Sequence, residues 1–172
     1  MRYVFVDFEM NLIDSEHKQE MKICKNEIIE IGAVKLDDEY NEIDSFKSYV
    51  KPVFGSMASR IIKLTGITDE LLADAPLYEE AIGKFIEWCS DADVIYAWSE
   101  NDLRQFCKEA RLKSYMHPQI EETISKWKDF QKEYAKMIGT SRRISLSDAV
   151  FYLGENFQGA EHDALWDARN TS

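Results

Sequence analysis

Tyr3-Val4-Phe5-Val6 runs directly into Asp7-Phe8-Glu9 near the N-terminus. This continuous apolar run predicts a strand that is buried on both faces and that ends at Asp7. Carboxylates at positions i and i+2 of an extended segment point the same way, so Asp7 and Glu9 could bind one metal centre. The alternative is that the strand has already ended and that both groups are only solvated. The position of the two residues alone does not distinguish a metal site from two solvated carboxylates.

The rest of the chain alternates strand and helix patterns. Segments 27–36 and 43–50 predict two strands joined by a hairpin around 37–41, and 93–97 predicts a fourth strand. Helices are predicted over 78–89, over 101–112 after an N-cap at Ser99, from Ser145 to Gly154, and from near Glu161 onward, with a helical turn at 69–73. Residues 126–137 fit either a helix or, near 124–128, a short strand. The order predicts an α/β fold on a mixed sheet, three antiparallel strands and then parallel ones, in one domain over residues 1–172.

The amino-acid composition is typical of a soluble globular protein and not of a membrane, secreted or disulfide-rich one. The 172 residues are 45% hydrophobic and 31% charged, as in a soluble globular protein. No window approaches the ~18 consecutive apolar residues of a membrane span, and the N-terminal apolar run meets Asp7 too early for a signal peptide. Three cysteines are an odd number without paired spacing, which argues against a disulfide framework. These features predict a cytoplasmic protein.

The net charge of −11 argues against a protein that coats nucleic acid, because phosphate binding normally requires a basic surface. A metal site would, however, hide several carboxylate charges from this count. The stretch 113–145 is locally basic, with seven basic and four acidic residues. A metal-dependent phosphodiesterase therefore remains open.

Individually, the candidate site residues are weak signals. Chance yields about 1.5 D-x-E triplets at this composition, and the chain has three, of which those at Asp14 and Asp37 lie in polar stretches. Asp102 follows a buried strand, where a first-turn carboxylate that complements the helix dipole is common. His162 and Asp167 lie five residues apart near the last helix, only roughly on one face. Together, these residues gather at strand ends and helix starts, where open α/β sheets place their sites.

At this point the chain resembles a known family, the DEDDh-type 3′→5′ exonucleases of the ribonuclease H-like fold. Its D-x-E motif is similar to Asp7-Phe8-Glu9, and its H-x-A-L-x-D-A motif is similar to the segment from His162 to Ala168. The strand, polar turn and Asp of its second motif resemble residues 94–102, with Trp98 typical of the branch of histone-mRNA and small-RNA exonucleases and their bacterial relatives. Residues 28–34 and 64–68 resemble its I-x-E-I-G-A and T-G-I segments.

The resemblance implies a two-metal site with Mg²⁺, for which Mn²⁺ would substitute. Asp7 would bridge both ions, and Glu9 and Asp167 would be further ligands. Asp102 would act through metal-bound water. His162 would take the proton from the attacking water. The 3′ nucleotide would meet the backbone around Phe8 and Met10 and a wedge formed by Ile67. The substrate would be the 3′ end of single-stranded RNA or DNA, with RNA favoured, and the product nucleoside 5′-monophosphates. Residues 126–143 are a candidate track for the nucleic-acid backbone, and a solvated helix face is the alternative for this stretch.

Other functions stay open. A single-stranded DNA exonuclease would use the same five residues, an enzyme for very short oligonucleotides would suit the acidic surface, and a non-catalytic RNA-binding module would share the fold. The five intact residues argue against the last of these. Two departures from the resemblance stand out: Asn11 occupies a position where many members have Thr, and the chain stops at Ser172, where relatives usually continue the last helix, which favours a trimmed chain.

Overall fold

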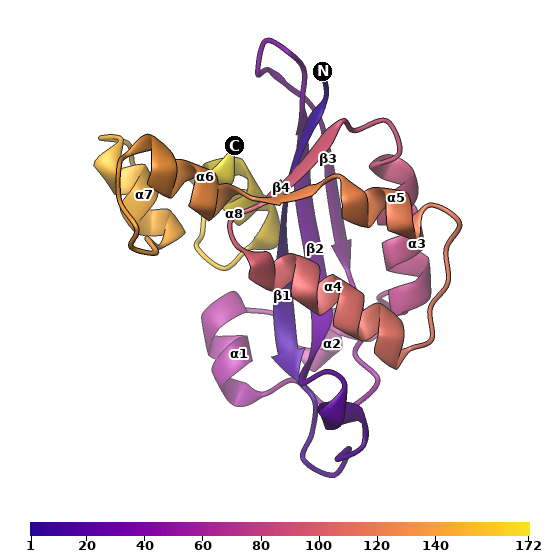
Figure 1. Ribbon diagram of the computed structural model, residues 1–172. Coiled ribbons are helices and arrows are strands. Elements are labelled where there is room, and N and C mark those ends of the chain that lie inside the picture. The colour runs from indigo at the N-terminus through magenta and orange to yellow at the C-terminus, as the bar shows by residue number, and fades with distance from the viewer.

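The computed structural model describes all residues, 1–172, and its centre is a five-stranded mixed sheet (Figure 1). The strands stand in the order β3-β2-β1-β4-β5. β1 pairs antiparallel with β2, and β2 with β3, whereas β4 runs parallel to β1, and β5 to β4. The predicted mixed sheet is therefore confirmed. The strand bounds are β1 Tyr3–Leu12, β2 Asn26–Leu36, β3 Glu42–Tyr49, β4 Val94–Ala97 and β5 Trp127–Asp129.

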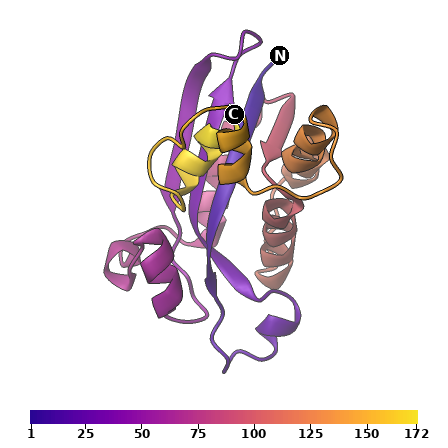
Figure 2. The ribbon, with the colours of Figure 1, turned by 90° about the vertical axis from the view of Figure 1, so that its left-hand side faces the viewer.

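Helices cover both faces of this sheet. α3, α4 and α5 lie on one side, whereas α6, α7 and α8 lie on the other (Figure 1). Viewed from that second side, α8 lies in front of the central strands (Figure 2). No helix combines the length and the apolar character that crossing a membrane requires. The helix bounds are α1 Ser59–Thr65, α2 Asp69–Leu72, α3 Tyr78–Trp88, α4 Glu100–Leu112, α5 Ile120–Ser125, α6 Phe130–Met137, α7 Leu146–Tyr152 and α8 Ala164–Thr171, with a short 3₁₀ turn at Glu20–Lys22.

The alternation of side chains along β1 separates the main core from the polar face. Val4, Val6 and Phe8 point into the main hydrophobic core, where they meet α3 and α4. Phe5 points the other way, into a smaller cluster that includes Leu165 of α8. Because strand side chains alternate with a period of two, Asp7 follows Phe5 onto the face that α8 covers. The main core thus anchors β1 from behind while leaving its carboxylates on the opposite face.

β1 is longer than its apolar run predicted. The strand does not end at Asp7 but continues through Glu9 to Leu12, paired with β2 as far as Asn26. The reason is the antiparallel partner: backbone pairing continues along β2 although the β1 side chains become polar. A register shift after Glu9 marks a β-bulge, a feature that is common beside active sites.

One other prediction needed correction, and one open alternative was resolved. The last helix begins at Ala164 and not near Glu161, because the Asp163 side chain caps it by accepting hydrogen bonds from the backbone N–H groups of Leu165 (3.1 Å) and Trp166 (3.3 Å). The ambiguous segment 126–137 contains both alternatives, β5 followed by α6. The short helices α1 and α5 were not predicted.

Gly32 allows α8 to lie directly on the sheet. It stands opposite Asp7 in the β1–β2 pairing. A Cβ atom at this position would lie 2.1 Å from the carbonyl carbon of Ala164 and 2.1 Å from the backbone nitrogen of Leu165. These neighbours are backbone atoms and cannot rotate away. Only glycine therefore admits α8 at this distance, and α8 carries Asp167.

We predict that Gly32→Ala destabilises the fold by at least 1–3 kcal/mol, the usual range for overpacking, because the added methyl group displaces the start of α8. Gly83→Ala is the matched control: it lies inside α3, its Cβ would meet only the Tyr115 hydroxyl at 3.2 Å, and alanine favours the helix by up to ~1 kcal/mol. Urea denaturation of both variants measures the difference. Equal stabilities would show that α8 does not depend on this contact.

Candidate active site

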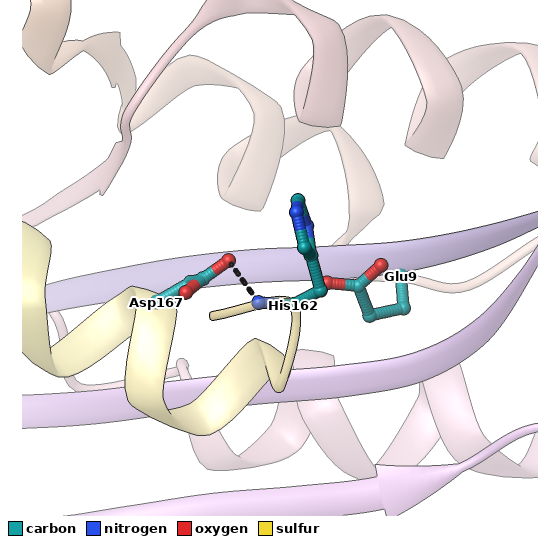
Figure 3. Close-up of side chains that lie close together, drawn as sticks. All are labelled: Glu9, His162 and Asp167. Atoms are coloured by element: carbon teal, nitrogen blue, oxygen red, sulfur yellow. Dashed lines mark hydrogen bonds between the residues drawn. The ribbon is translucent and has the colours of Figure 1, made fainter. Parts of the chain in front are cut away.

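The candidate site lies on the face of β1 that α8 covers. Glu9, His162 and Asp167 each place a potential ligand atom within 4.8 Å of the others (Figure 3). Glu9 comes from β1 and Asp167 from the first turn of α8, and His162 lies between them just before that helix (Figure 3). Three of the five predicted residues are thus brought together from opposite ends of the chain.

Asp102 joins the site from the edge of β1. β4 pairs with β1 only as far as Phe5, and its chain then turns into α4. The N–H of Phe8 therefore has no strand partner on that side, and it donates to Asp102 Oδ1 at 3.3 Å. Ser99 caps α4 by accepting from the N–H of Asn101, as predicted. The hydrogen bond from the N–H of Phe8 takes the place of the pairing that β4 does not provide beyond Phe5, and it holds Asp102 beside Asp7.

Asp7, Glu9, Asp102 and Asp167 form what we call the carboxylate cluster. Burial raises the pKa of all four members, and nearby carboxylates add to this effect. Burial is the largest cause in each case; repulsion from Asp102, Asp167 and Glu9 adds to it for Asp7, whose pKa lies well above its ordinary value. The pKa rises to about 8 for Glu9, about 7 for Asp102 and about 6 for Asp167. Such a cluster is unfavourable without a cation.

The donor set suits a divalent metal ion. Asp167 Oδ1 is buried and has no hydrogen-bond partner, whereas its Oδ2 accepts from the backbone N–H of His162 at 3.3 Å. A buried carboxylate oxygen without a partner is expensive unless something else satisfies it. Carboxylate oxygens are the ligands that Mg²⁺ and Mn²⁺ prefer. The residues therefore fit a hard cation at this position.

His162 has an unusual backbone. Its φ of 64° lies in the left-handed region, which costs a non-glycine residue about 1–2 kcal/mol. The residue is half-buried and lines a hollow of about 150 Å³ with Asp167, Glu161, Phe157 and Ser145–Ser147. The prediction that His162 belongs to the helix start was wrong, because the helix begins after it. Strained residues of this kind concentrate at functional sites.

A network of charged side chains next to the carboxylate cluster was not predicted from the sequence. Glu30 is 2% exposed, stands opposite Glu9 on β2, and accepts a hydrogen bond from the N–H of Ala164 at 3.1 Å. Lys47 of β3 bridges Glu30 (2.9 Å) and Asp163 (2.6 Å). This network ties the start of α8 to the sheet. One signal pointed to it: Glu30 is a lone charge within the apolar segment Ile28–Ile31.

The predicted substrate-binding residues are mostly covered. Phe8 is 5% exposed and packs its ring near Phe85 and Trp127, so only its backbone is available on the site face. Met10 is half-buried against the same core. Ile67 is 2% exposed in a separate cluster with Met57 and Leu72. Contacts of these three residues with a nucleotide stay predictions.

Asn11, which departs from the resemblance, is fully buried. Its amide nitrogen donates to the carbonyl of Ser56 at 3.0 Å, and its amide oxygen accepts from the N–H of Ala58 at 3.0 Å. The side chain therefore joins the end of β1 to the segment before α1. This use of both amide groups explains why an amide fits there.

The raised pKa values predict how the stability of the metal-free protein depends on pH. Each carboxyl group of the cluster binds its proton more tightly in the folded than in the unfolded chain, so its contribution is complete near pH 4 and is lost as pH rises toward 8. Asp7→Asn removes one repelling charge. At pH 8, in chelator, we expect the variant to exceed the wild type in free energy of unfolding by about 1–3 kcal/mol, the usual penalty of a buried polar group that lacks a partner.

Urea unfolding at pH 4.5 and pH 8 measures this gain, which should be smaller at the lower pH. Asp38→Asn makes the same chemical change at an exposed position of the β2–β3 hairpin, and it should show no gain that grows with pH. An Asp7→Asn variant no more stable than the wild type at pH 8 would contradict the electrostatic account of the cluster.

Comparison with known proteins supports a relationship over the whole chain. The mouse 3′-5′ exoribonuclease 1 is 29% identical over 156 residues, which cover 84% of this chain and 44% of the mouse protein. The DNA polymerase III subunit epsilon of Aquifex aeolicus is 29% identical over 173 residues, which cover 99% of this chain and 76% of that subunit. This chain therefore spans less than half the length of the mouse relative.

Solved structures share the fold. The nuclease domain of 3′hExo, a DEDDh family member solved with bound rAMP, superposes with a TM-score of 0.83 at 22% identity, over 98% of this chain and 86% of that domain. The expected ribonuclease H-like fold is confirmed by this likeness. The family described as Exonuclease (RNase_T) matches residues 4–172. The chain belongs to this exonuclease family.

Proposed function

We propose that this protein is a metal-dependent 3′→5′ exonuclease that releases nucleoside 5′-monophosphates from single-stranded nucleic acid, with RNA favoured. The observation that carries the proposal is the convergence of Glu9, His162 and Asp167 within 4.8 Å on a face that also holds Asp7 and Asp102. Hard anionic ligands beside an imidazole are the groups that metal-assisted phosphodiester hydrolysis requires.

The carboxylate cluster would hold two divalent ions, Mg²⁺ or Mn²⁺. When bound, such ions supply a nucleophile at neutral pH and stabilise the attacking and leaving oxygens. Asp7 is central, because its carboxyl group is within electrostatic reach of the other three, which supports a ligand shared between both ions. Glu9 and Asp167 would be further ligands, Asp167 through its unpartnered Oδ1. Asp102, fixed by the N–H of Phe8, would complete the set.

His162 would accept the proton of the attacking water. The backbone N–H of His162, and not its ring, donates to Asp167, so this contact leaves both imidazole nitrogens free. A ring nitrogen of His162 lies within 4.8 Å of a carboxylate oxygen of Asp167, which keeps the proton acceptor beside a proposed ligand. A histidine is suited to this role because imidazole is the side chain that most often serves as a general base.

RNA is the favoured substrate because a relative that covers 84% of the chain is an exoribonuclease. A single-stranded DNA exonuclease is the second candidate, supported by the likeness to a DNA polymerase III subunit over 99% of the chain. We also infer a cytoplasmic location, which the three free cysteines support.

A digestion panel tests the activity and the metal together. With 5′-labelled single-stranded RNA, DNA and duplex substrates, we expect shortening from the 3′ end in Mg²⁺ or Mn²⁺, fastest on RNA, and none in excess chelator. Asp7→Asn should lower the rate by orders of magnitude, since it removes the charge of the shared ligand, whereas Asp38→Asn should keep it. Full activity in chelator, or in Asp7→Asn, would place the chemistry elsewhere.

Substitutions of His162 test the proton acceptor. His162→Ala should lower kcat about 10²- to 10⁴-fold while Mg²⁺ binding, measured by calorimetry, persists. His162→Asn is the matched control for the backbone: asparagine tolerates the left-handed conformation better than alanine, so it should be more stable yet equally inactive.

The pH profile separates the chemistry of His162 from its structural effect. A proton acceptor must be unprotonated to act, so at saturating Mg²⁺ the wild-type rate should rise with pH, and this rise should be absent from both variants. An unchanged rate and an unchanged profile in His162→Ala would remove the histidine from the reaction.

A further inference from the structure

A surface hollow lies beside the candidate active site and is not part of it. It has a volume of about 350 Å³ and is formed by α7 and the segment that joins it to α6. Both helices lie on the side of the sheet that carries α8, away from α3 and α5 (Figure 1). The lining residues are Ile138, Thr140, Arg142, Arg143, Ile144, Asp148 and Tyr152.

The hollow is cationic on an otherwise acidic protein. Arg142 and Arg143 are exposed, and neither guanidinium group is engaged in an ion pair, unlike Arg104 or Arg169. Asp148 is the one acidic lining residue, and its Oδ2 accepts a hydrogen bond from Ser145 Oγ at 2.7 Å. Two free guanidinium groups that line one hollow, on a chain of net charge −11, favour an anionic ligand there.

An exposed aromatic side chain accompanies the two arginines. Tyr152, in the last turn of α7, is 65% exposed, and Ile138 across the hollow is 45% exposed. A ring face beside guanidinium groups is the combination that single-stranded nucleic acid uses, since bases stack on aromatic rings while phosphates meet cations. An acidic peptide would use the arginines but would leave the ring exposed.

The segment that lines the hollow leads along the chain into the candidate site. The Ile144 carbonyl accepts hydrogen bonds from Trp98 Nε1 (3.2 Å) and Gln131 Nε2 (2.6 Å), which fix this segment against the body. Ser145 and Leu146, the next residues, line the hollow that contains His162 and Asp167. Two residues of extended chain span at most ~7 Å, so Arg143 stands close to the reacting end.

We propose that Arg142, Arg143 and Tyr152 form a subsite for a nucleotide upstream of the scissile phosphate. The arginines bind backbone phosphates, and Tyr152 stacks on a base. The subsite rests on the proposed exonuclease function and makes binding dependent on substrate length: an oligonucleotide long enough to reach the hollow gains affinity that a dinucleotide lacks.

Arg142→Ala/Arg143→Ala tests the phosphate contacts. In the Asp7→Asn background, which prevents digestion, fluorescence anisotropy with single-stranded RNA of about 12 nucleotides should show roughly tenfold weaker binding at low salt. The slope of log K against log[salt] should fall by about 1.4, because each phosphate contact contributes about 0.7. Lys108→Ala/Arg111→Ala removes two exposed, unpaired cations of α4 and should change neither quantity.

Tyr152 has its own pair of controls. Tyr152→Ala should weaken the same RNA about tenfold, the effect of one lost stacking contact. Tyr152→Phe keeps the ring and should bind normally. Phe151→Ala removes a neighbouring exposed ring that does not line the hollow, and it should also bind normally.

Dinucleotide hydrolysis separates this proposal from the proposed function. With Asp7 intact, the arginine and Tyr152 variants should cleave a dinucleotide at the wild-type rate and lose only the advantage of longer substrates, seen as a raised KM. If the wild type cleaves neither substrate, the proposed function fails, while the anisotropy measurement still tests the subsite. Unchanged RNA affinity and salt slope in the double arginine variant would overturn the subsite.

Discussion

The contact between the backbone of α8 and Gly32 is the constraint on which the candidate site depends. Asp7 is fixed by the sheet and Asp167 by the helix, so their separation is set by how closely these two elements approach. A side chain at position 32 would hold the helix away, because the atoms it meets are backbone atoms that cannot rotate. The network of Glu30, Lys47 and Asp163 then fixes the start of α8 against the strands.

The same geometry works against the stability of the metal-free protein. Bringing the carboxylate cluster onto one face buries like charges, and the pKa values of its members rise in response. The main core behind β1 supplies the compensation: Val4, Val6 and Phe8 anchor the strand from the opposite face. Alternation along one strand therefore separates the residues that hold the fold from those that would hold the metal.

The sequence predicted the mixed sheet of antiparallel and then parallel strands, because apolar runs and capping residues act locally, and motif resemblance supplied the five candidate residues. It placed the end of β1 too early, because pairing with β2 continues beyond the apolar residues. It assigned His162 to a helix, because the left-handed turn before α8 has no signature in a histidine. The role of Lys47 could not be predicted from the sequence, because it depends on the β2–β3 register that places this residue opposite Gly32.

The left-handed backbone of His162 has an evolutionary consequence. Glycine or asparagine would adopt this conformation with less strain than histidine. Substitution of His162 by either residue would therefore stabilise the fold but remove the imidazole. A lineage that had stopped using the site would be free to accept that exchange. If His162 accepts the proton as proposed, retaining histidine here costs stability, and relatives with glycine at this position are where inactive descendants should be sought.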